Sequence, residues 1–204
     1  MIVFDAKRHG AALDPMIPPA LRLTAEQREG LLRFAELVSQ WGRKTDLVAG
    51  ASVDQLLEVL FVDAFHLHVF MQSGGTRWVD VGAGAGAPSI PLALLDPSRT
   101  FVLRELRRKR LAFMRHAAGA LGLGARVRVE EPPSPDAETF DVALSRATFA
   151  PAEWLERAVG LSDVCLVLLG QNEAPSDERW TLQRQLAYAL PSGSPRRLVQ
   201  YGAR

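Results

Sequence analysis

The chain has 204 residues, 48% of them hydrophobic, which suits one domain with an ordinary core or one domain with a helical appendage. Its 24 basic and 23 acidic residues give a formal net charge of +1, which argues against a protein that coats polyanions but leaves room for a local basic patch. The single cysteine, Cys165, excludes an internal disulfide and any multi-cysteine metal site, and its apolar neighbours favour a buried position.

The first part of the chain is predicted to be helical. Residues 1–20 have no clear period, and we expect an arm there. Thr24 opens a capping box, after which apolar residues follow at helical spacing. Ser52 opens a second box before another apolar helix. We therefore expect an arm and helical extension over residues 1–74, followed by the main domain over residues 75–204.

Strand-like and helix-like segments alternate in the main domain. Alternating units of this kind predict a mostly parallel sheet with helices on both faces. The last two segments favour an antiparallel pair. The expected strands are 77–81, 101–105, 127–130, 140–144, 164–169, 182–189 and 197–201, and the expected helices are 88–95, 109–121 and 152–161.

The segment after the first strand carries the most specific signal. It has glycine at three alternate positions, where the lack of a Cβ lets the backbone approach a ligand closely. The spacing G-x-G-x-G-x-P differs from the G-x-G-x-x-G of dinucleotide sites, which disfavours a nicotinamide dehydrogenase. It fits the D-x-G-x-G-x-P loop of S-adenosylmethionine (SAM) methyltransferases better. The candidate cofactor contacts are Asp80, Gly82, Ala83, Gly84, Gly86 and Ala87.

Two further candidates stand at strand ends, where ligands bind in doubly wound sheets. Glu105 ends the second strand about twenty residues after the glycine loop, where an acid can accept both ribose hydroxyls. Arg146 follows the 140–144 strand and is expected to face the crevice. There it could hold the SAM carboxylate, a substrate phosphate or a base, so it is also the candidate catalytic residue, with a positioning role.

A basic run lies beside the same crevice. Phosphate contacts there would give RNA an affinity that depends on salt and ignores base sequence. The alternative for such a run is an ordinary solvated face. The candidate RNA-binding residues are Arg104, Arg107, Arg108, Lys109 and Arg110.

No metal and no membrane span are expected. His66 and His68 are two residues apart on a predicted helix, so they point to different faces. No run of 18 apolar residues is present, and the first residues lack the basic-then-apolar order of a signal peptide. We therefore expect a cytoplasmic protein, and a monomer.

These motifs resemble the RsmG (GidB) family of SAM-dependent methyltransferases, which methylate N7 of a guanine in small-subunit (16S) ribosomal RNA. The resemblance runs from about Leu31 to Gln171. Three segments carry it. Asp80–Ala93 resembles D-V-G-[TS]-G-x-G-x-P-G-[IL]-P-L-A, Lys109–Met114 resembles K-R-x-x-F-L, and Ser145–Ala147 resembles S-R-A.

The resemblance implies a Rossmann-like class I SAM methyltransferase fold with a helical N-terminal extension. It implies SAM as methyl donor, S-adenosylhomocysteine as product, and ribosomal RNA or the small ribosomal subunit as partner. Among the residues, it implies that Gly82 and Ala87 touch SAM, that Glu105 is the acid of the second strand, that Arg146 is the crevice arginine, and that Val129 and Glu130 lie near adenine.

The sequence departs from the family pattern at several polar positions. The family's R-H-x-x-D-S becomes V-L-F-V-D-A, with Leu60 and Ala64 in place of polar residues and Asp63 kept, and Leu169 replaces the lysine of a K-G pair. Guanine N7 has a free lone pair, so such losses weaken the selection of guanine more than the transfer itself. Two alternatives stay open: a non-catalytic RNA- or ribosome-binding relative, and a methyltransferase for a small molecule or a protein.

Overall fold

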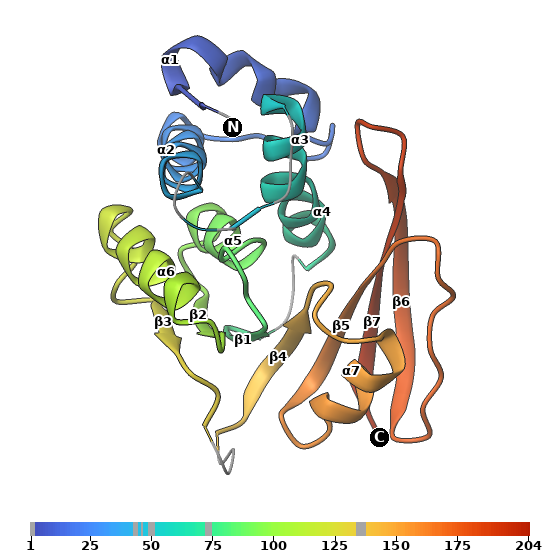
Figure 1. The fold of residues 1–204 in the computed structure, drawn as a ribbon. Helices are drawn as coiled ribbons and strands as arrows, with labels where there is room; N and C mark the ends of the chain where they lie inside the picture. Colours follow the sequence, from blue (N-terminus) through green and yellow to red (C-terminus); the bar gives the residue numbers. More distant parts are fainter. Residues whose placement is uncertain (1–2, 43–44, 46, 49–51, 72–74, 134–137) are drawn as a thin grey trace.

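The computed structural model describes residues 3–42, 45, 47–48, 52–71, 75–133 and 138–204. Its centre is a sheet with the strand order β3-β2-β1-β4-β5-β7-β6 (Figure 1). Strands β1 to β5 run parallel, and β7 lies antiparallel between β5 and β6. The strands are β1 Arg77–Val81, β2 Thr100–Arg104, β3 Val127–Glu130, β4 Phe140–Ser145, β5 Ser162–Leu169, β6 Trp180–Ala189 and β7 Pro195–Ala203.

The helices match the expected alternation of elements. The two helices expected in the N-terminal part form, and the second contains a π-helical turn between two α-helical parts. The helical elements are α1 Ala6–His9, the 3₁₀ turn η1 Gly10–Met16, α2 Ala25–Trp41, α3 Val53–Leu57, the π turn η2 Glu58–Val62, α4 Asp63–Phe70, α5 Ser89–Leu95, α6 Arg108–Ala120 and α7 Pro151–Ala158.

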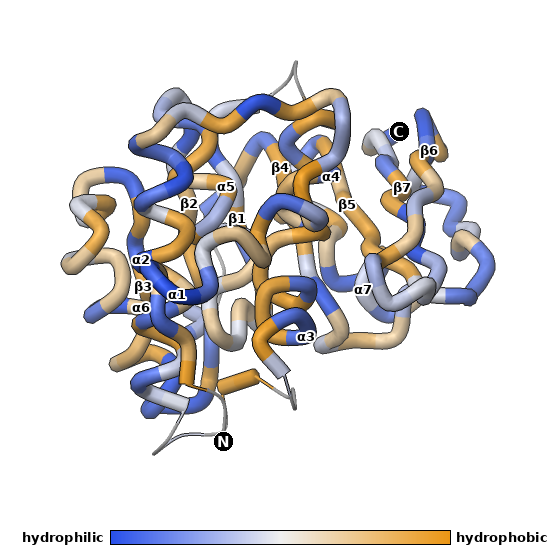
Figure 2. Tube along the Cα trace, turned by 90° about the horizontal axis from the view of Figure 1, so that it is seen from above, coloured by the Kyte–Doolittle hydropathy of each residue, from blue (hydrophilic) through white to orange (hydrophobic). Residues whose placement is uncertain are grey.

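The helices cover the two faces of the sheet unequally. Neighbouring strand residues point to opposite faces, so Trp78 packs under the large group of helices from α2 to α6, whereas Val79 packs on the side of α7 (Figure 1). Cys165 lies buried on that second side, and burial raises the pKa of its thiol. Seen from above (Figure 2), β5 inside the sheet is coloured hydrophobic, and the outermost loop beside β6 is mainly hydrophilic. The predicted α/β class, with an antiparallel strand pair at the carboxyl end, is confirmed.

The N-terminal arm is more ordered than its sequence suggested. Instead of an arm without regular structure, α1 and η1 form, and the side chains of Phe4 before α1 and of Leu13 and Met16 in η1 are buried. These side chains join the same hydrophobic cluster as the sheet residue Trp78. The division at residues 74 and 75 stays a prediction, because the helical part and the sheet share this core. None of the described helices is long and apolar enough to span a membrane.

The third glycine of the loop provides a test of the fold. Gly86 has φ +80°, and a Cβ there would lie 2.5 Å from Cδ1 of the buried Ile90. We expect Gly86→Ala to lower the free energy of unfolding by roughly 2–4 kcal/mol, because left-handed strain and overpacking add. Gly119→Ala is the control, because a Cβ near the end of α6 meets open space. Urea denaturation that shows equal stability of the two variants would contradict this account.

Candidate functional site

The glycine loop has the backbone that only glycine adopts easily. Gly82, Gly84 and Gly86 have φ values of 79°, 60° and 80°. The amides of Gly82 and Ala83 donate to the carbonyl oxygen of Arg104, at 2.8 and 3.1 Å. The loop after β1 is therefore held against the end of β2 by main-chain bonds. A Cβ would point at Thr148 from Gly82, at the end of Arg110 from Gly84, and at Ile90 from Gly86.

Glu105 lies at the end of β2, as predicted, and its carboxylate holds the loop. Oε2 accepts a hydrogen bond from the amide of Gly84 at 3.1 Å, and Oε1 accepts from the amides of Leu106 and Arg107 at 2.9 and 3.0 Å. Arg110 approaches Oε2 to 3.6 Å. The carboxylate thus joins the glycine loop to the start of α6, and most of its acceptor positions are engaged by the protein itself.

A cavity of about 340 Å³ opens beside this loop, and we call it the glycine-loop cavity. Gly82, Glu105, Arg107 and Phe149 are among the residues that line it. Thr148 closes one side, because a Cβ at Gly82 would lie 2.3 Å from the Thr148 Oγ1. The Thr148 hydroxyl donates to the Gly82 carbonyl oxygen at 3.1 Å, but this residue is exposed, so its side chain has room to turn away.

Asp80 lies beneath the loop rather than in the cavity. It is 1% exposed, and its Oδ2 accepts a hydrogen bond of 2.6 Å from the Ser89 hydroxyl at the start of α5. Burial raises the pKa of Asp80 to about 7, an effect that the Ser89 hydrogen bond and the charge of Arg146 reduce. In this structure Asp80 ties β1 to α5, and its predicted contact with a cofactor stays a prediction.

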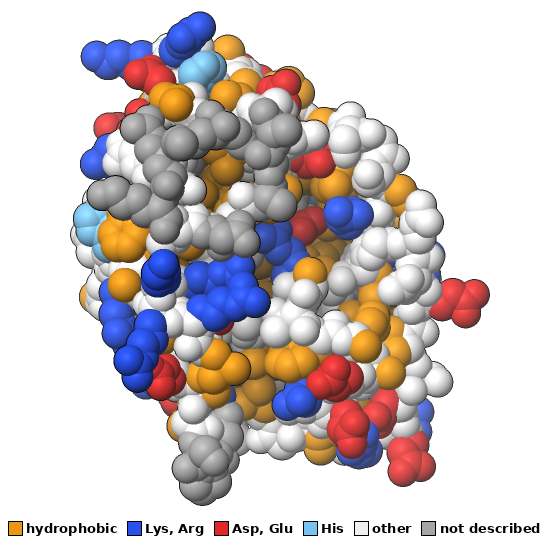
Figure 3. Space-filling model, in the orientation of Figure 1, with side chains coloured by type: hydrophobic (Ala, Val, Ile, Leu, Met, Phe, Trp, Pro, Cys, Tyr) orange, Lys and Arg blue, Asp and Glu red, His pale blue; other side chains and the backbone are white. Residues whose placement is uncertain are grey.

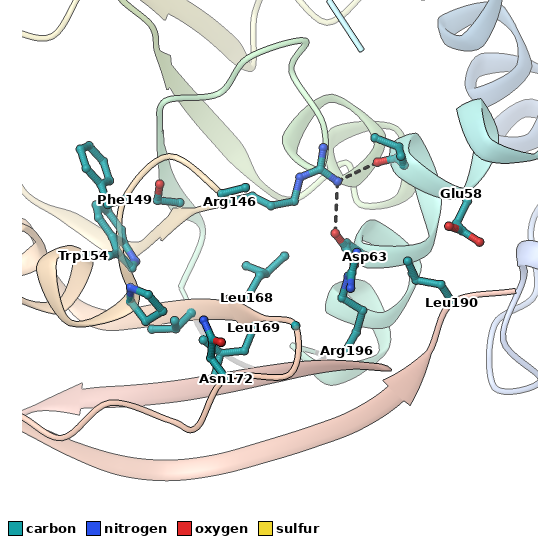
Figure 4. A pocket seen from close by; sticks show the side chains of 16 residues that line it. Glu58, Asp63, Arg146, Phe149, Trp154, Leu168, Leu169, Asn172, Leu190 and Arg196 are labelled. Atoms are coloured by element: carbon teal, nitrogen blue, oxygen red, sulfur yellow. Dashed lines mark hydrogen bonds and ion pairs between the residues drawn. The ribbon is translucent and has the colours of Figure 1, made fainter. Parts of the chain in front are cut away.

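A second cavity of about 470 Å³ lies at the carboxyl ends of β4 and β5, and we call it the Arg146 cavity (Figure 4). Nη1 of Arg146 donates to the Val59 carbonyl oxygen at 2.7 Å and lies 3.1 Å from Oδ2 of Asp63. Arg146 therefore faces this cavity and is not among the residues that line the glycine-loop cavity, so its predicted contact with the cofactor stays a prediction. The apolar wall and the polar rim include Phe149, Trp154, Leu168, Asn172 and Arg196.

The loop after β4 separates the two cavities. Ala147 has φ +56°, a left-handed conformation that costs a residue with a Cβ about 1–2 kcal/mol. This backbone turns Arg146 toward one cavity and Thr148 toward the other. Ala147 and Phe149 line both cavities, so the two spaces lie on either side of this loop.

The basic run divides into exposed and buried residues. Arg107, Arg108 and Lys109 are exposed around the start of α6, and Arg107 lines the glycine-loop cavity. Figure 3 shows Lys and Arg side chains gathered near the middle of one face of the molecule. Arg104 is 2% exposed, its Nε lies 3.0 Å from Oε1 of Glu130, and its guanidinium lies over the Phe140 ring. This burial and pairing do not support the predicted contact of Arg104 with RNA phosphates.

Val129 and Glu130 lie outside both cavities. The carbonyl oxygen of Val129 accepts hydrogen bonds from Arg115, and the carboxylate of Glu130 pairs with Arg104 and Arg128. Neither residue is among those that line the glycine-loop cavity. Their contact with adenine stays a prediction that this geometry does not support.

Comparison with known proteins decides the family. The family model GidB, described as rRNA small subunit methyltransferase G, matches residues 27–188. The chain belongs to the GidB family. The ribosomal RNA small subunit methyltransferase G of Methylococcus capsulatus is 36% identical over 170 residues, which cover 81% of each chain. The methyltransferase of the same name from Psychromonas ingrahamii is 36% identical over 132 residues, which cover 63% of this chain and 62% of the relative.

Solved structures show the same fold in distant methyltransferases. The O-methyltransferase TomG from Streptomyces achromogenes, solved in complex with SAM, superposes with a TM-score of 0.61 at 16% identity and covers all of both chains. At this identity the likeness concerns the fold alone. The predicted membership in the GidB family and the predicted class I methyltransferase fold are both confirmed.

Several residues of this GidB chain take part in the site without having been predicted. Thr148, Tyr188 and Arg196 lie at the cavities or contact Asp63, and no sequence pattern distinguishes them. Asp63 did carry a signal, because it is the one position of the R-H-x-x-D-S motif that the chain keeps.

The raised pKa of Asp80 predicts a pH dependence of stability. Asp80 binds its proton more tightly in the folded state than in the unfolded state, where its pKa is about 3.8. The stability of the wild type should therefore fall as the pH rises from about 4 to 7. Asp80→Asn stays neutral and can still accept from Ser89. We expect the variant to gain stability relative to wild type between about pH 5 and pH 8, by roughly 2–4 kcal/mol.

The measurement is urea denaturation of both proteins across this pH range. Asp163→Asn, at an exposed acid of β5, is the matched control and should follow the wild type. Parallel curves for Asp80→Asn and wild type would show that Asp80 does not hold its proton in the folded protein.

Proposed function

We propose that this GidB chain transfers the methyl group of SAM to N7 of a guanine in small-subunit ribosomal RNA, in the cytoplasm. The observation that carries the proposal is the pair of neighbouring cavities that share Ala147 and Phe149 in their walls, one beside the glycine loop and one around Arg146. A methyl donor and a methyl acceptor must approach each other from two sides, and this arrangement offers one space to each.

The residues of the glycine-loop cavity fit SAM. A Cβ at Gly84 would meet the end of Arg110 at 3.6 Å and the Gly82 carbonyl oxygen at 3.9 Å, both ordinary contact distances, so the loop leaves space above its backbone there. Glu105 would receive a ribose hydroxyl with the acceptor capacity that the main-chain amides leave, and Phe149 offers an apolar surface. SAM, when bound, supplies an electrophilic methyl group on a sulfonium. Thr148 would turn away from Gly82 to admit it.

The Arg146 cavity suits a flat, polar base. Phe149 and Trp154 provide an aromatic wall, stacked on each other at 6.0 Å. Among the described residues, no hydrogen bond occupies Nη2 of Arg146, so this nitrogen can donate to guanine O6 next to N7. Because N7 carries a lone pair and no proton, the protein needs no proton-accepting residue. It needs to position the guanine and exclude water.

The exposed residues Arg107, Arg108 and Lys109 support a nucleic-acid substrate. Arg107 lines the glycine-loop cavity and the other two follow it at the start of α6, where an RNA strand that delivers a base to the Arg146 cavity would pass. Their contacts would be to phosphates, which position the strand without reading its sequence.

A second candidate is a non-catalytic relative that binds ribosomal RNA. Two observations favour it: the Thr148 side chain packs against Gly82, and the Glu105 oxygens are already engaged by main-chain amides. Such a protein would bind the small subunit through the same basic residues and would leave SAM unbound.

The test is SAM binding followed by methyl transfer. We expect SAM and S-adenosylhomocysteine to bind with an affinity on the order of micromolar in calorimetry. Small subunits from cells that lack this methyltransferase should then gain one N7-methylguanine, mapped by chain cleavage at the modified base. If the protein binds RNA but calorimetry detects no binding of SAM or S-adenosylhomocysteine, the result supports the second candidate and contradicts the first.

Two arginine variants sharpen this test. Arg146→Ala should lower kcat/KM for the RNA by roughly 100-fold and change SAM affinity by less than about twofold, because Arg146 lies in the acceptor cavity. Arg28→Ala is the matched control, because Arg28 also holds one carbonyl oxygen, of Gly10, and one carboxylate, of Asp14, but lines neither cavity. It should keep wild-type activity.

Charge reversal tests the basic rim separately. Arg107→Glu with Arg108→Glu should weaken RNA binding at least about tenfold and reduce the slope of log affinity against log salt by about 1–2. Lys7→Glu with Arg8→Glu, at two exposed neighbours on α1, is the control. Equal effects of the two pairs, measured by filter binding over a salt series, would show that the rim is an ordinary solvated face.

A further inference from the structure

The C-terminal hairpin of β6 and β7 lies against the N-terminal helical extension along one helix face. The Glu58 carboxylate accepts hydrogen bonds from the amide and the hydroxyl of Ser192, at 2.8 and 2.9 Å. Farther along the helix, the Tyr188 hydroxyl donates to Oδ1 of Asp63 at 2.6 Å. The His66 ring stacks on the Tyr188 ring, with centroids 4.0 Å apart. The hairpin is therefore attached at several points to the helix that carries Asp63.

The π turn η2 explains how this face is built. Residues five apart, such as Glu58 and Asp63, do not share a face of a regular α-helix. In a turn closed by bonds from residue i to i+5 they lie nearly above one another, so both reach the hairpin. In the same turn, the Val59 carbonyl oxygen accepts from Arg146. Turns of this kind occur frequently at functional sites.

Asp63 connects the hairpin to Arg146. It is 7% exposed, and its two oxygens have different partners: Tyr188 on Oδ1, and Nη1 of Arg146 on Oδ2 (Figure 4). Of its two partners, Arg146 brings the compensating charge, and Tyr188 fixes the rotation of the carboxylate. Both contacts of the guanidinium in the described structure, to Val59 and Asp63, use the same nitrogen, Nη1.

We propose that Asp63 and Tyr188 are positioning residues, which hold Nη1 of Arg146 so that Nη2 faces the acceptor nucleotide. This inference rests on the proposed function, because the nucleotide belongs to it. It assigns the C-terminal hairpin a part in the site, although Tyr188 is 125 residues from Asp63 in the chain and does not line the cavity. Loss of the hydroxyl frees the Asp63 carboxylate to rotate, and the guanidinium then samples orientations that do not meet the base.

The experiment compares two tyrosine variants of the same hairpin. Tyr188→Phe removes only the hydroxyl that contacts Asp63 and keeps the ring on His66. Tyr201→Phe is the matched control, because it removes an equally short bond of 2.6 Å, to the Pro175 carbonyl oxygen, on the other side of the sheet. We expect Tyr188→Phe to lower kcat for small-subunit RNA about tenfold with unchanged SAM affinity, and Tyr201→Phe to stay within about twofold of wild type.

A double-mutant cycle separates positioning from a general structural role. If Tyr188 acts through Arg146, Tyr188→Phe should change kcat/KM by less than about twofold in the Arg146→Ala background. An equal loss in both backgrounds, or equal activities of Tyr188→Phe and Tyr201→Phe, would overturn the proposal.

A second measurement needs no activity. The side-chain ¹⁵N–¹H signals of Arg146, assigned by their loss in Arg146→Lys, should shift and broaden in Tyr188→Phe and not in Tyr201→Phe. Unchanged signals would overturn the positioning role even in an active enzyme. If the wild type fails to bind SAM or methylate RNA, but the Arg146 signals still change in Tyr188→Phe, the proposed function alone is refuted.

Discussion

The structure depends on the contact between the Glu105 carboxylate and the main chain around it. One oxygen accepts from Gly84 in the loop after β1, and the other accepts from Leu106 and Arg107 before α6. Charge-assisted hydrogen bonds to backbone amides are stronger than neutral ones, and these lie at a largely buried group. They fix where the loop ends, where α6 begins and therefore where the exposed basic residues stand relative to the glycine-loop cavity.

This contact also limits how a methyl donor can bind. The same carboxylate that would receive ribose hydroxyls already serves three amides, and the Thr148 side chain occupies the space beside Gly82. A carboxylate has about four acceptor positions, so one remains for a ligand. Thr148 is exposed, and its hydroxyl has the carbonyl oxygens of Gly82 and Arg146 as acceptors for its one hydrogen. Moving this side chain therefore costs on the order of 1 kcal/mol, well within the free energy of micromolar binding.

The sequence predicted the parts of the site that depend on local backbone geometry. The spacing predicted a glycine loop after the first strand and an acid at the end of the second, and the structure has Gly82, Gly84 and Gly86 at positive φ and Glu105 directly after β2. The burial of Arg104 was not predicted. A basic run predicts side chains exposed to solvent. No helix is described in the stretch of chain between β3 and β4, and the Arg104 side chain packs on Phe140 and pairs with Glu130 instead. Tyr188 could not be predicted either, because a contact across 125 residues leaves no mark on local periodicity.

The central claim is that the glycine-loop cavity binds the methyl donor, and the most direct test is a structure of the chain crystallised with S-adenosylhomocysteine. The expected result is the nucleoside beside Gly82 and Gly84, with a ribose hydroxyl on Glu105 and Thr148 turned away from the loop. A structure obtained at saturating nucleoside with Thr148 still against Gly82 and the cavity empty would contradict the claim.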